Sequence, residues 1–368
     1  MGPVRQATLI LAGLSIRRAA GTLAGIALGL LALEAGLRPF ETPAAEPPAR
    51  IAADSFSLPP VSARQLEEGL GDAHYSPAGA RLTGSATQAN APVVVILGDS
   101  YVAAREVRDE QTMGAHVESS LRSRGIPVNV RQYGTRGATP ALYVAEAREV
   151  LQRWNPAAVV VVLSYDDIDH HPLMEGSPHI AIVNGRGVLV GSLPRTPAAP
   201  PSGVLAHSTL ARLFVRRRLQ LLARSPRFVR EWWIRSGHPA NPGDPVVTRT
   251  TSPTPGELEA VPRVVVQMLH EAFGQRLVIA WVTEVRVSGP PVSETYERSL
   301  FTACRAEQVT CLTARAEMLA GRDSGVILRG FPTSTLGEGH LNAEGHRVMG
   351  AIIAHELEPR LRAPEATH

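Results

Sequence analysis

A run of five apolar residues, Val93–Leu97, followed at once by Gly98, Asp99 and Ser100, constrains the fold of this 368-residue chain more than any other feature. The run is mostly β-branched and contains no polar residue, so it predicts a strand that is buried on both faces of a parallel sheet. In such sheets ligands bind beyond the carboxyl ends of the strands. Ser100 is therefore expected at a functional edge, although Asp and Ser also serve as helix N-caps, and this motif alone leaves both roles open.

Alternating helices and strands follow this first strand and predict the architecture. Apolar residues have helical spacing at 110–124, 140–154, 255–273, 292–307 and 342–357, and apolar strands are expected at 128–130, 157–163, 276–282 and 309–313. This order specifies a parallel, doubly wound sheet with right-handed crossovers. We therefore predict a flavodoxin-like, three-layer α/β/α fold over residues 89–360.

Residues 170–255 interrupt this pattern, and we interpret them as an insertion into one domain. Residues 180–190 resemble a β-hairpin with a tight glycine turn. Residues 212–235 contain eight arginines between Leu, Phe and Trp residues. Two interpretations remain open for this segment: a solvated helix pair packed on the domain, or a surface for anionic lipid or an acidic polymer.

The amino terminus differs in kind from the rest of the chain. Arg17 and Arg18 precede the uncharged run 19–33, and the apolar character resumes after Glu34 as far as Leu37. Fifteen helical residues span about 22 Å, and the flanks extend this toward the hydrocarbon thickness of about 30 Å. We predict that residues 1–38 are an N-terminal transmembrane helix or a signal segment, with a cytoplasmic amino terminus.

This prediction implies a single-pass protein of the cytoplasmic membrane whose main domain is extracytoplasmic. A cleaved signal peptide and a buried amphipathic helix are the alternatives. Residues 39–88 begin with a Pro- and Ala-rich stretch and are predicted to be a stiff spacer between membrane and domain.

Charge and cysteine content add two constraints. The net charge of +3 is mild, and all basic residues are arginine, so the composition does not call for a nucleic-acid partner. The two cysteines, Cys304 and Cys311, are expected near the end of a helix and on the following strand. Outside the cytoplasm a disulfide between them is allowed, and two buried free thiols are an equal alternative.

A histidine far downstream gives Ser100 a chemical partner. His340 is expected in the loop before the last helix, and Glu338 precedes it by two residues. A nucleophilic serine needs a base, and that base needs an acceptor that fixes its tautomer. Ser100, His340 and Glu338 fill these roles if the fold brings both loops to one edge. His346, inside the predicted helix, is interpreted as a packing or capping residue.

These blocks resemble the SGNH (GDSL-like) hydrolase superfamily. The resemblance rests on the strand with Gly98-Asp99-Ser100, on the Gly134 turn and on the block from His340 to His346, and it covers about 90–170 and 255–360. The anchor, the spacer and the Asp-rich loop at 166–169 are more similar to the membrane-attached bacterial branch. The resemblance implies that Ser100 is the nucleophile, that His340 is the general base, and that the backbones of Ser100 and Gly134 form an oxyanion hole.

Two blocks depart from the family pattern. The third block usually ends Gly-x-Asn-Asp, but here Tyr165 or Asp166 stands where the oxyanion-binding Asn is expected. Tyr165 can donate through its hydroxyl, whereas an ionised Asp166 repels an oxyanion. The fourth block usually reads Asp-x-x-His, but Gly337 replaces the Asp. Glu338 instead matches the Asp-x-His spacing of alginate-type O-acetyltransferases, with Glu for Asp.

The resemblance implies a serine-dependent acyl-ester hydrolase or O-acyltransferase that acts outside the cytoplasm on acylated small molecules or envelope glycans. The alternative is a degenerate SGNH domain that serves as a binding or assembly component of envelope polysaccharide machinery. No cofactor or metal is expected. The acidic residues at 166–169 with His170 and His171 are adjacent on one loop and cannot all point at one ion. A nucleotide binder is disfavoured because no Gly-x-Gly-x-x-Gly turn follows the first strand.

Overall fold

The computed structural model describes residues 21, 22, 24–36, 61–64, 68, 69, 71–168, 178–191, 255–285 and 294–362. The chain divides into two units: residues 43–197 with 244–368 form one, and residues 1–42 with 198–243 form the other. In the second unit the described residues are 21, 22 and 24–36, which are helical. None of the described helices is both long enough and apolar enough to cross a membrane. The remainder of the predicted anchor and the arginine-rich segment lie outside the described residues.

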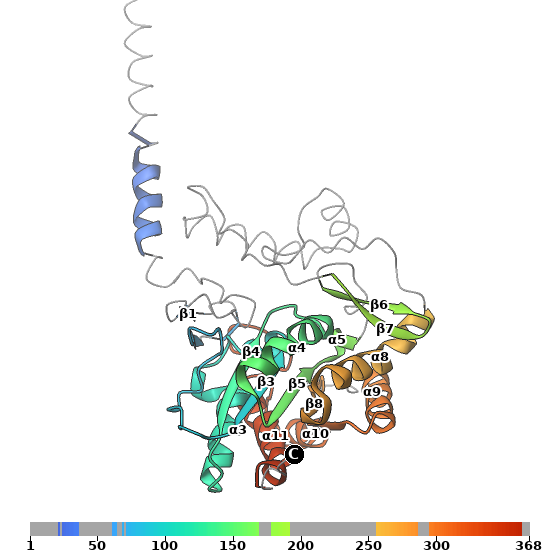
Figure 1. Ribbon diagram of the computed structural model, residues 1–368. Helices are drawn as coiled ribbons and strands as arrows, with labels where there is room; N and C mark the ends of the chain where they lie inside the picture. The colour runs from blue at the N-terminus through green and yellow to red at the C-terminus, as the bar shows by residue number, and fades with distance from the viewer. Residues whose placement is uncertain are drawn as a thin grey trace, which may run out of the picture. The chain divides into compact units, whose positions relative to one another are not determined.

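A five-stranded sheet is the centre of the larger unit (Figure 1), and its strand order is β4-β3-β5-β8-β9. The strands are β3 (Val93–Gly98), β4 (Asn129–Gly134), β5 (Ala158–Leu163), β8 (Leu277–Trp281) and β9 (Thr310–Thr313). All neighbouring pairs are parallel. This confirms the predicted parallel sheet. The order reverses between β3 and β5, and such a switch point opens a crevice at the carboxyl ends of the two strands.

Helices cover both faces of this sheet, as Figure 1 shows. The side chains of Val94 and Ile96 pack into a core with α3 (Met113–Ser123), α10 (Arg315–Asp323) and α11 (Ala343–Arg362). Val95 and Leu97 point to the other face and pack with α4 (Pro140–Trp154), α8 (Pro255–Phe273) and α9 (Glu294–Ala306). Because successive strand residues point to opposite faces, one apolar run supplies both cores. The three layers match the prediction. Helix α10 was not predicted.

The predicted hairpin forms a small separate sheet. Strands β6 (His179–Val183) and β7 (Arg186–Val190) are antiparallel. Asn184 and Gly185 both have positive φ, as a type I′ turn requires. The hairpin packs on α8, because a Cβ atom at Gly187 would lie 2.5 Å from the sulfur of Met268.

Part of the predicted spacer belongs to the folded domain instead. Strands β1 (Val61–Arg64) and β2 (Asp72–Tyr75) pair with each other, and Arg81 then forms a bridge to Gln132 of β4. Tyr75 and Arg81 are buried. The spacer prediction is therefore corrected for residues 71–83, which are part of the folded domain.

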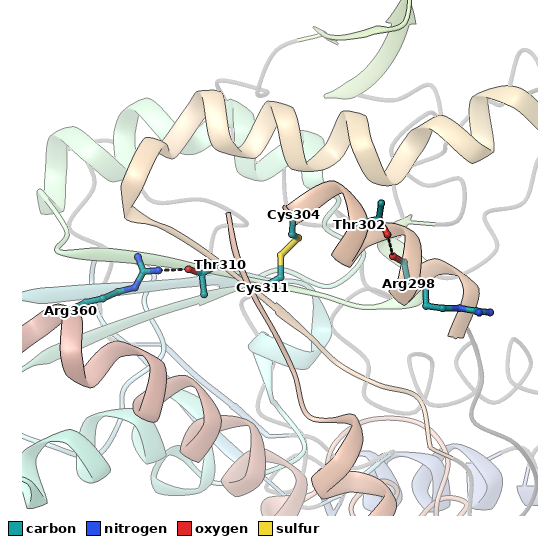
Figure 2. Close-up of a disulfide and its surroundings, with 6 residues drawn as sticks. All are labelled: Arg298, Thr302, Cys304, Thr310, Cys311 and Arg360. Atoms are coloured by element: carbon teal, nitrogen blue, oxygen red, sulfur yellow. Dashed lines mark hydrogen bonds between the residues drawn. A yellow bond between two sulfur atoms is a disulfide. The ribbon is translucent and has the colours of Figure 1, made fainter. Parts of the chain in front are cut away.

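The two cysteines of the chain form a disulfide, which Figure 2 shows. Cys304 near the end of α9 and Cys311 on β9 have their Cα atoms 6.2 Å apart, within the usual range. The free-thiol alternative is wrong. Arg360 of α11 donates a hydrogen bond to Thr310, and Thr302 donates to the carbonyl of Arg298 at 2.9 Å. The disulfide thus joins helix α9, which has its own internal hydrogen bond, to the edge strand β9, which is hydrogen-bonded to α11.

Removal of the disulfide should lower the stability of this edge. Replacement of both Cys304 and Cys311 by serine is expected to lower the free energy of unfolding by about 2 kcal/mol, because the closed loop is short. Urea unfolding of the full chain measures the difference. The parent should lose the same stability in reductant, whereas the double variant should not respond to reductant. A parent that is indifferent to reductant contradicts this prediction.

Candidate active site

Three neighbouring strands end at one edge of the sheet and bring the predicted site residues together. Gly98 at the end of β3 pairs with Gly134 at the end of β4, and Leu97 pairs with Val161 of β5. Ser100, Gly134 and the turn after β5 therefore share the edge at which the strand order reverses. The fold thus places the family-like blocks where open α/β sheets bind ligands.

Ser100 begins the one-turn helix α2 (Ser100–Ala103), and Asp99 caps this helix. A carboxylate oxygen of Asp99 accepts a hydrogen bond from the backbone N–H of Tyr101 at 2.9 Å. Asp99 is buried, whereas Ser100 is half-buried. The capping role therefore belongs to Asp99 and leaves the hydroxyl of Ser100 free of that role.

Gly134 packs directly on this helix. A Cβ atom at Gly134 would lie 1.8 Å from the backbone nitrogen of Ala103 and 2.3 Å from the carbonyl carbon of Val102. No side chain fits there, so glycine is required for the close approach of β4 to α2. This contact fixes the backbone of Gly134 beside the helix that carries Ser100.

His340 precedes α11 and is paired with a carboxylate that the sequence did not indicate. The Oε2 atom of Glu68 lies 2.6 Å from Nδ1 of His340, and Oε1 accepts the backbone N–H of His340 at 2.9 Å. Gly339 makes room for this contact, because a Cβ atom there would lie 2.2 Å from Oε1 of Glu68. Both oxygens of Glu68 thus hold one histidine.

The expectation that Glu338 supports His340 is therefore corrected. The side chain of Glu338 is exposed, and its backbone N–H turns back to the carbonyl of Thr335 at 3.2 Å. Glu68 takes the place expected for Glu338. It lies 272 residues from His340 and within the segment interpreted as a spacer, so no local spacing could have indicated it.

The surroundings of His340 favour its charged form. Burial alone would lower the pKa of His340, but the bond to Glu68 and the negative charges of Glu106 and Asp99 outweigh it and raise the pKa. Burial would raise the pKa of Glu68, but the contacts with His340 lower it overall. An ionised carboxylate only accepts hydrogen bonds, so Nδ1 of His340 is the donor. In the neutral ring Nε2 then carries the lone pair that a general base needs.

Arg329 ties the histidine loop to the helix of Ser100. Its guanidinium, which is buried, donates to the carbonyl of Gly339 at 2.7 Å and 3.0 Å and also to the hydroxyl of Tyr101. The rings of Tyr101 and His340 have centroids 5.5 Å apart. Tyr101, which follows Ser100, and Gly339, which precedes His340, therefore both accept hydrogen bonds from Arg329.

Carboxyl groups of the third block lie close to Asp99 at this edge, and burial favours the protonated form of Asp99 and Asp167. Burial raises the pKa of Asp99 to about 6, and Asp166 adds to this increase. Asp167 accepts hydrogen bonds from the backbone and the hydroxyl of Ser164 at 2.8 Å and 3.0 Å, and burial raises its pKa well above the usual value.

The two side chains considered as oxyanion donors lie differently in this block. Tyr165, in α5 (Tyr165–Ile168), has its ring 6.2 Å from the ring of Tyr296. Asp166 is exposed, yet its charge raises the pKa of both Asp99 and Tyr101, so it lies near helix α2, which carries Ser100. The residues after 168 in the predicted acidic loop lie outside the described residues.

His346 packs inside the domain, as predicted. It is buried in α11, and burial lowers its pKa to about 3, so the ring is neutral at physiological pH.

One group among the described residues has the ligand spacing of a metal site. The ligand atoms of Glu68, Glu106 and His340 all lie within 4.8 Å of one another. The short contact between Glu68 and Nδ1 of His340 occupies the nitrogen that a metal ion would need. The geometry therefore fits a histidine supported by carboxylates.

Comparison with known proteins identifies structural relatives only. No protein-family model matches the chain, and no curated protein matches it. The chain is similar to the solved structure of an acetyl xylan esterase, with 13% identity and a TM-score of 0.39 over 72% of this chain and 99% of that chain.

Two further solved structures are of bacterial proteins. A lipase/acylhydrolase from Enterococcus faecalis has 13% identity and a TM-score of 0.37 over 75% of this chain and 100% of that chain. A member of the lipolytic protein G-D-S-L family from Veillonella parvula has 11% identity and a TM-score of 0.36 over 73% and 100%.

The Glu68–His340 contact predicts a selective effect on the histidine. In Glu68→Gln the pKa of His340 should fall, because the amide keeps a hydrogen-bond acceptor but removes the negative charge. NMR titration of the histidine rings in the full chain measures this, with the His340 signal assigned by its loss in His340→Ala. Glu338→Gln, which removes an exposed charge two residues away, is the matched control. Equal effects of the two substitutions would contradict the assignment of Glu68.

The contact between β4 and α2 predicts a stability effect. Gly134→Ala should destabilise the domain by about 3 kcal/mol or more, because backbone atoms surround the added methyl group and cannot move aside cheaply. Gly256→Ala is the control, since a Cβ atom there meets nothing within 4 Å. Thermal unfolding of the two variants compares them, and a Gly134→Ala protein as stable as the parent contradicts the tight contact.

Proposed function

We propose that the chain is an enzyme of the SGNH hydrolase type that carries out serine-dependent acyl-ester chemistry. The observation that carries this proposal is the pairing of His340 with Glu68 at the strand edge that holds Ser100. The ring centroid of His340 lies 5.5 Å from that of Tyr101, the residue that follows the half-buried Ser100. A serine and a histidine that is oriented by a carboxylate are the groups with which unrelated hydrolases activate a nucleophile. The motif resemblance of the Ser100, Gly134 and His340 blocks supports the same assignment.

The reaction has two steps. The hydroxyl oxygen of Ser100 attacks the ester carbonyl while Nε2 of His340 takes its proton. The tetrahedral intermediate then expels the alcohol, which receives that proton, and the acyl group remains on Ser100 as an ester. In the second step the hydroxyl of water or of a sugar attacks this ester while His340 takes its proton. The bond between the acyl carbon and the oxygen of Ser100 then breaks, and His340 returns the proton to Ser100. Water as acceptor gives hydrolysis, and a sugar hydroxyl gives O-acyl transfer.

Two charged groups form during this reaction, the imidazolium of His340 and the oxyanion of the tetrahedral intermediate, and different groups of the protein stabilise them. Glu68 stabilises the imidazolium that His340 becomes when it takes the proton. We assign the backbone N–H groups of Ser100 and Gly134 as oxyanion donors, and loss of one such donor typically costs about 2.7–4 kcal/mol. Tyr165 is the side-chain candidate for a third donor, because an ionised Asp166 accepts hydrogen bonds only.

We further propose that the domain acts outside the cytoplasm, tethered to the membrane, on acylated glycans of the cell envelope. The apolar run at the amino terminus supports the tether, and Ile26, Leu28 and Leu31 of its helix are exposed in the structure. The Cys304–Cys311 disulfide supports an oxidising compartment. The arginine-rich segment 212–235 supports an acidic polymer or a lipid surface as a neighbour.

A second candidate function is a binding or assembly component without catalysis. The observation that favours it is the acidic third block, in which Tyr165 or Asp166 stands where Asn is expected and Asp166 lies near the buried carboxyl group of Asp99. Negative charge at this position opposes an oxyanion. A domain of this kind would keep an acylated ligand bound without cleaving it.

A fluorophosphonate probe distinguishes the two functions, because it reacts only with an activated serine. The full chain should be labelled, and Ser100→Ala and His340→Ala should not be labelled. Ser123→Ala, which removes a serine at the end of α3, should be labelled like the parent. A folded parent that resists labelling, while it still binds acylated glycan, supports the binding component and overturns the enzyme assignment.

A further inference from the structure

We propose that Glu106 is a second positioning residue for His340, so that the histidine is supported by two carboxylates rather than by one. This proposal rests on the proposed serine chemistry and deepens it. Glu68 approaches His340 from the segment between β1 and β2, whereas Glu106 belongs to the loop that follows the helix of Ser100. The nucleophile loop thus carries its own support for the base.

The side chain of Glu106 is poorly explained by packing alone. It is 4% exposed, and its Oε1 atom lies 3.6 Å from Nδ1 of His340. Its Oε2 atom is buried and has no hydrogen-bond partner among the described residues. A buried carboxyl group with an unpaired oxygen is unfavourable for folding and calls for an explanation. The nearby histidine supplies one, because an imidazolium attracts the carboxylate.

A buried arginine holds the loop of Glu106 in place. Arg81 donates to the carbonyls of Ala103 at 2.8 Å, Ala104 at 2.9 Å and Val107 at 2.8 Å. Its Nε atom also bonds Asp109 at 2.6 Å. Three carbonyls on both sides of Glu106 are therefore bound to one guanidinium, which fixes the direction of the side chain toward His340.

The segment that carries Glu68 packs against the same loop. A Cβ atom at Gly69 would lie 2.2 Å from the carbonyl oxygen of Glu106, and one at Gly71 would lie 2.4 Å from that of Arg105. Glycine at both positions allows the two backbones to touch. The two carboxylates are thereby positioned relative to each other as well as to the histidine.

The charges around His340 agree with this role. Glu68, Glu106 and Asp99 favour its positive charge, and the positive charge of Arg329, which lies between α10 and α11, helps to lower the pKa of Glu68. Burial and the negative charge of Glu68 raise the pKa of Glu106, while His340 and Arg136 oppose the increase. The positive charge of His340 also lowers the pKa of the buried His346.

Electrostatic coupling between Glu106 and His340 determines in which direction the pKa of His340 should change when Glu106 is replaced. As His340 gains a proton, Glu106 loses its own more readily, and the two groups titrate as a coupled pair. Removal of Glu106 should then make the imidazolium less stable. The neutral base would persist to lower pH, and the imidazolium formed during the attack by Ser100 would be less stabilised.

The test is Glu106→Gln in the full chain, observed by NMR titration of His340 and by the pH dependence of fluorophosphonate labelling. We expect His340 to titrate at lower pH than in the parent. The acid limb of the labelling rate should shift in the same direction, and the plateau rate should fall about tenfold. Glu110→Gln, which removes an exposed charge four residues along the chain, should change neither measurement.

An unchanged titration of His340 in a folded Glu106→Gln protein overturns the proposal. If that variant fails to fold, Glu106→Asp takes its place, because it keeps the charge but withdraws it from His340. It should lower the pKa of His340 by less than Glu68→Gln does, and no change again overturns the proposal. A parent that is not labelled at all refutes the proposed function instead, while the titration still decides the role of Glu106.

Discussion

The buried guanidinium of Arg329 is the interaction on which the candidate site depends. It lies between the end of β8 and the loop before α11, where it bonds the carbonyls of Thr283 and Gly339 and the hydroxyl of Tyr101. A buried charge is unfavourable unless its donors are satisfied. Because these acceptors come from three separate segments, the arginine is stable only when the segments are correctly placed. Folding of this edge is thereby coupled to alignment of His340 with the helix of Ser100.

Arg81 has the same role on the other side of the site. It links the loop after α2 to Asp109 and, through the bridge to Gln132, to β4. The two buried arginines therefore hold the two loops that carry Glu106 and His340. The strands themselves contribute to the site only the backbone at their carboxyl ends. A parallel sheet supplies the location of a site, and the buried polar network supplies its geometry.

The sequence predicted the parts of this molecule whose signals are local. The apolar run before Gly98 identified β3 because a strand buried on both faces has no polar residue to interrupt it. The same reasoning located β5 and β8. Short strands were also predicted at β4 and β9, but β4 extends beyond the predicted 128–130 to Gly134. This reasoning missed β2 and the packing of residues 71–83, since short half-buried strands lack a distinctive pattern. The positions of Ser100, Gly134 and His340 at one edge followed from topology.

The acid that supports His340 could not be predicted in this way. Any carboxylate whose oxygens lie beside Nδ1 of the histidine can orient the ring, whichever segment of the chain carries that carboxylate. In this chain Gly337 occupies the position at which the family pattern has the acid, and Gly339 leaves space that an arriving side chain can use. Glu68 fills that space from 272 residues away. The glycines around the histidine were the signal in the sequence: they mark a loop shaped to receive a partner from elsewhere in the chain.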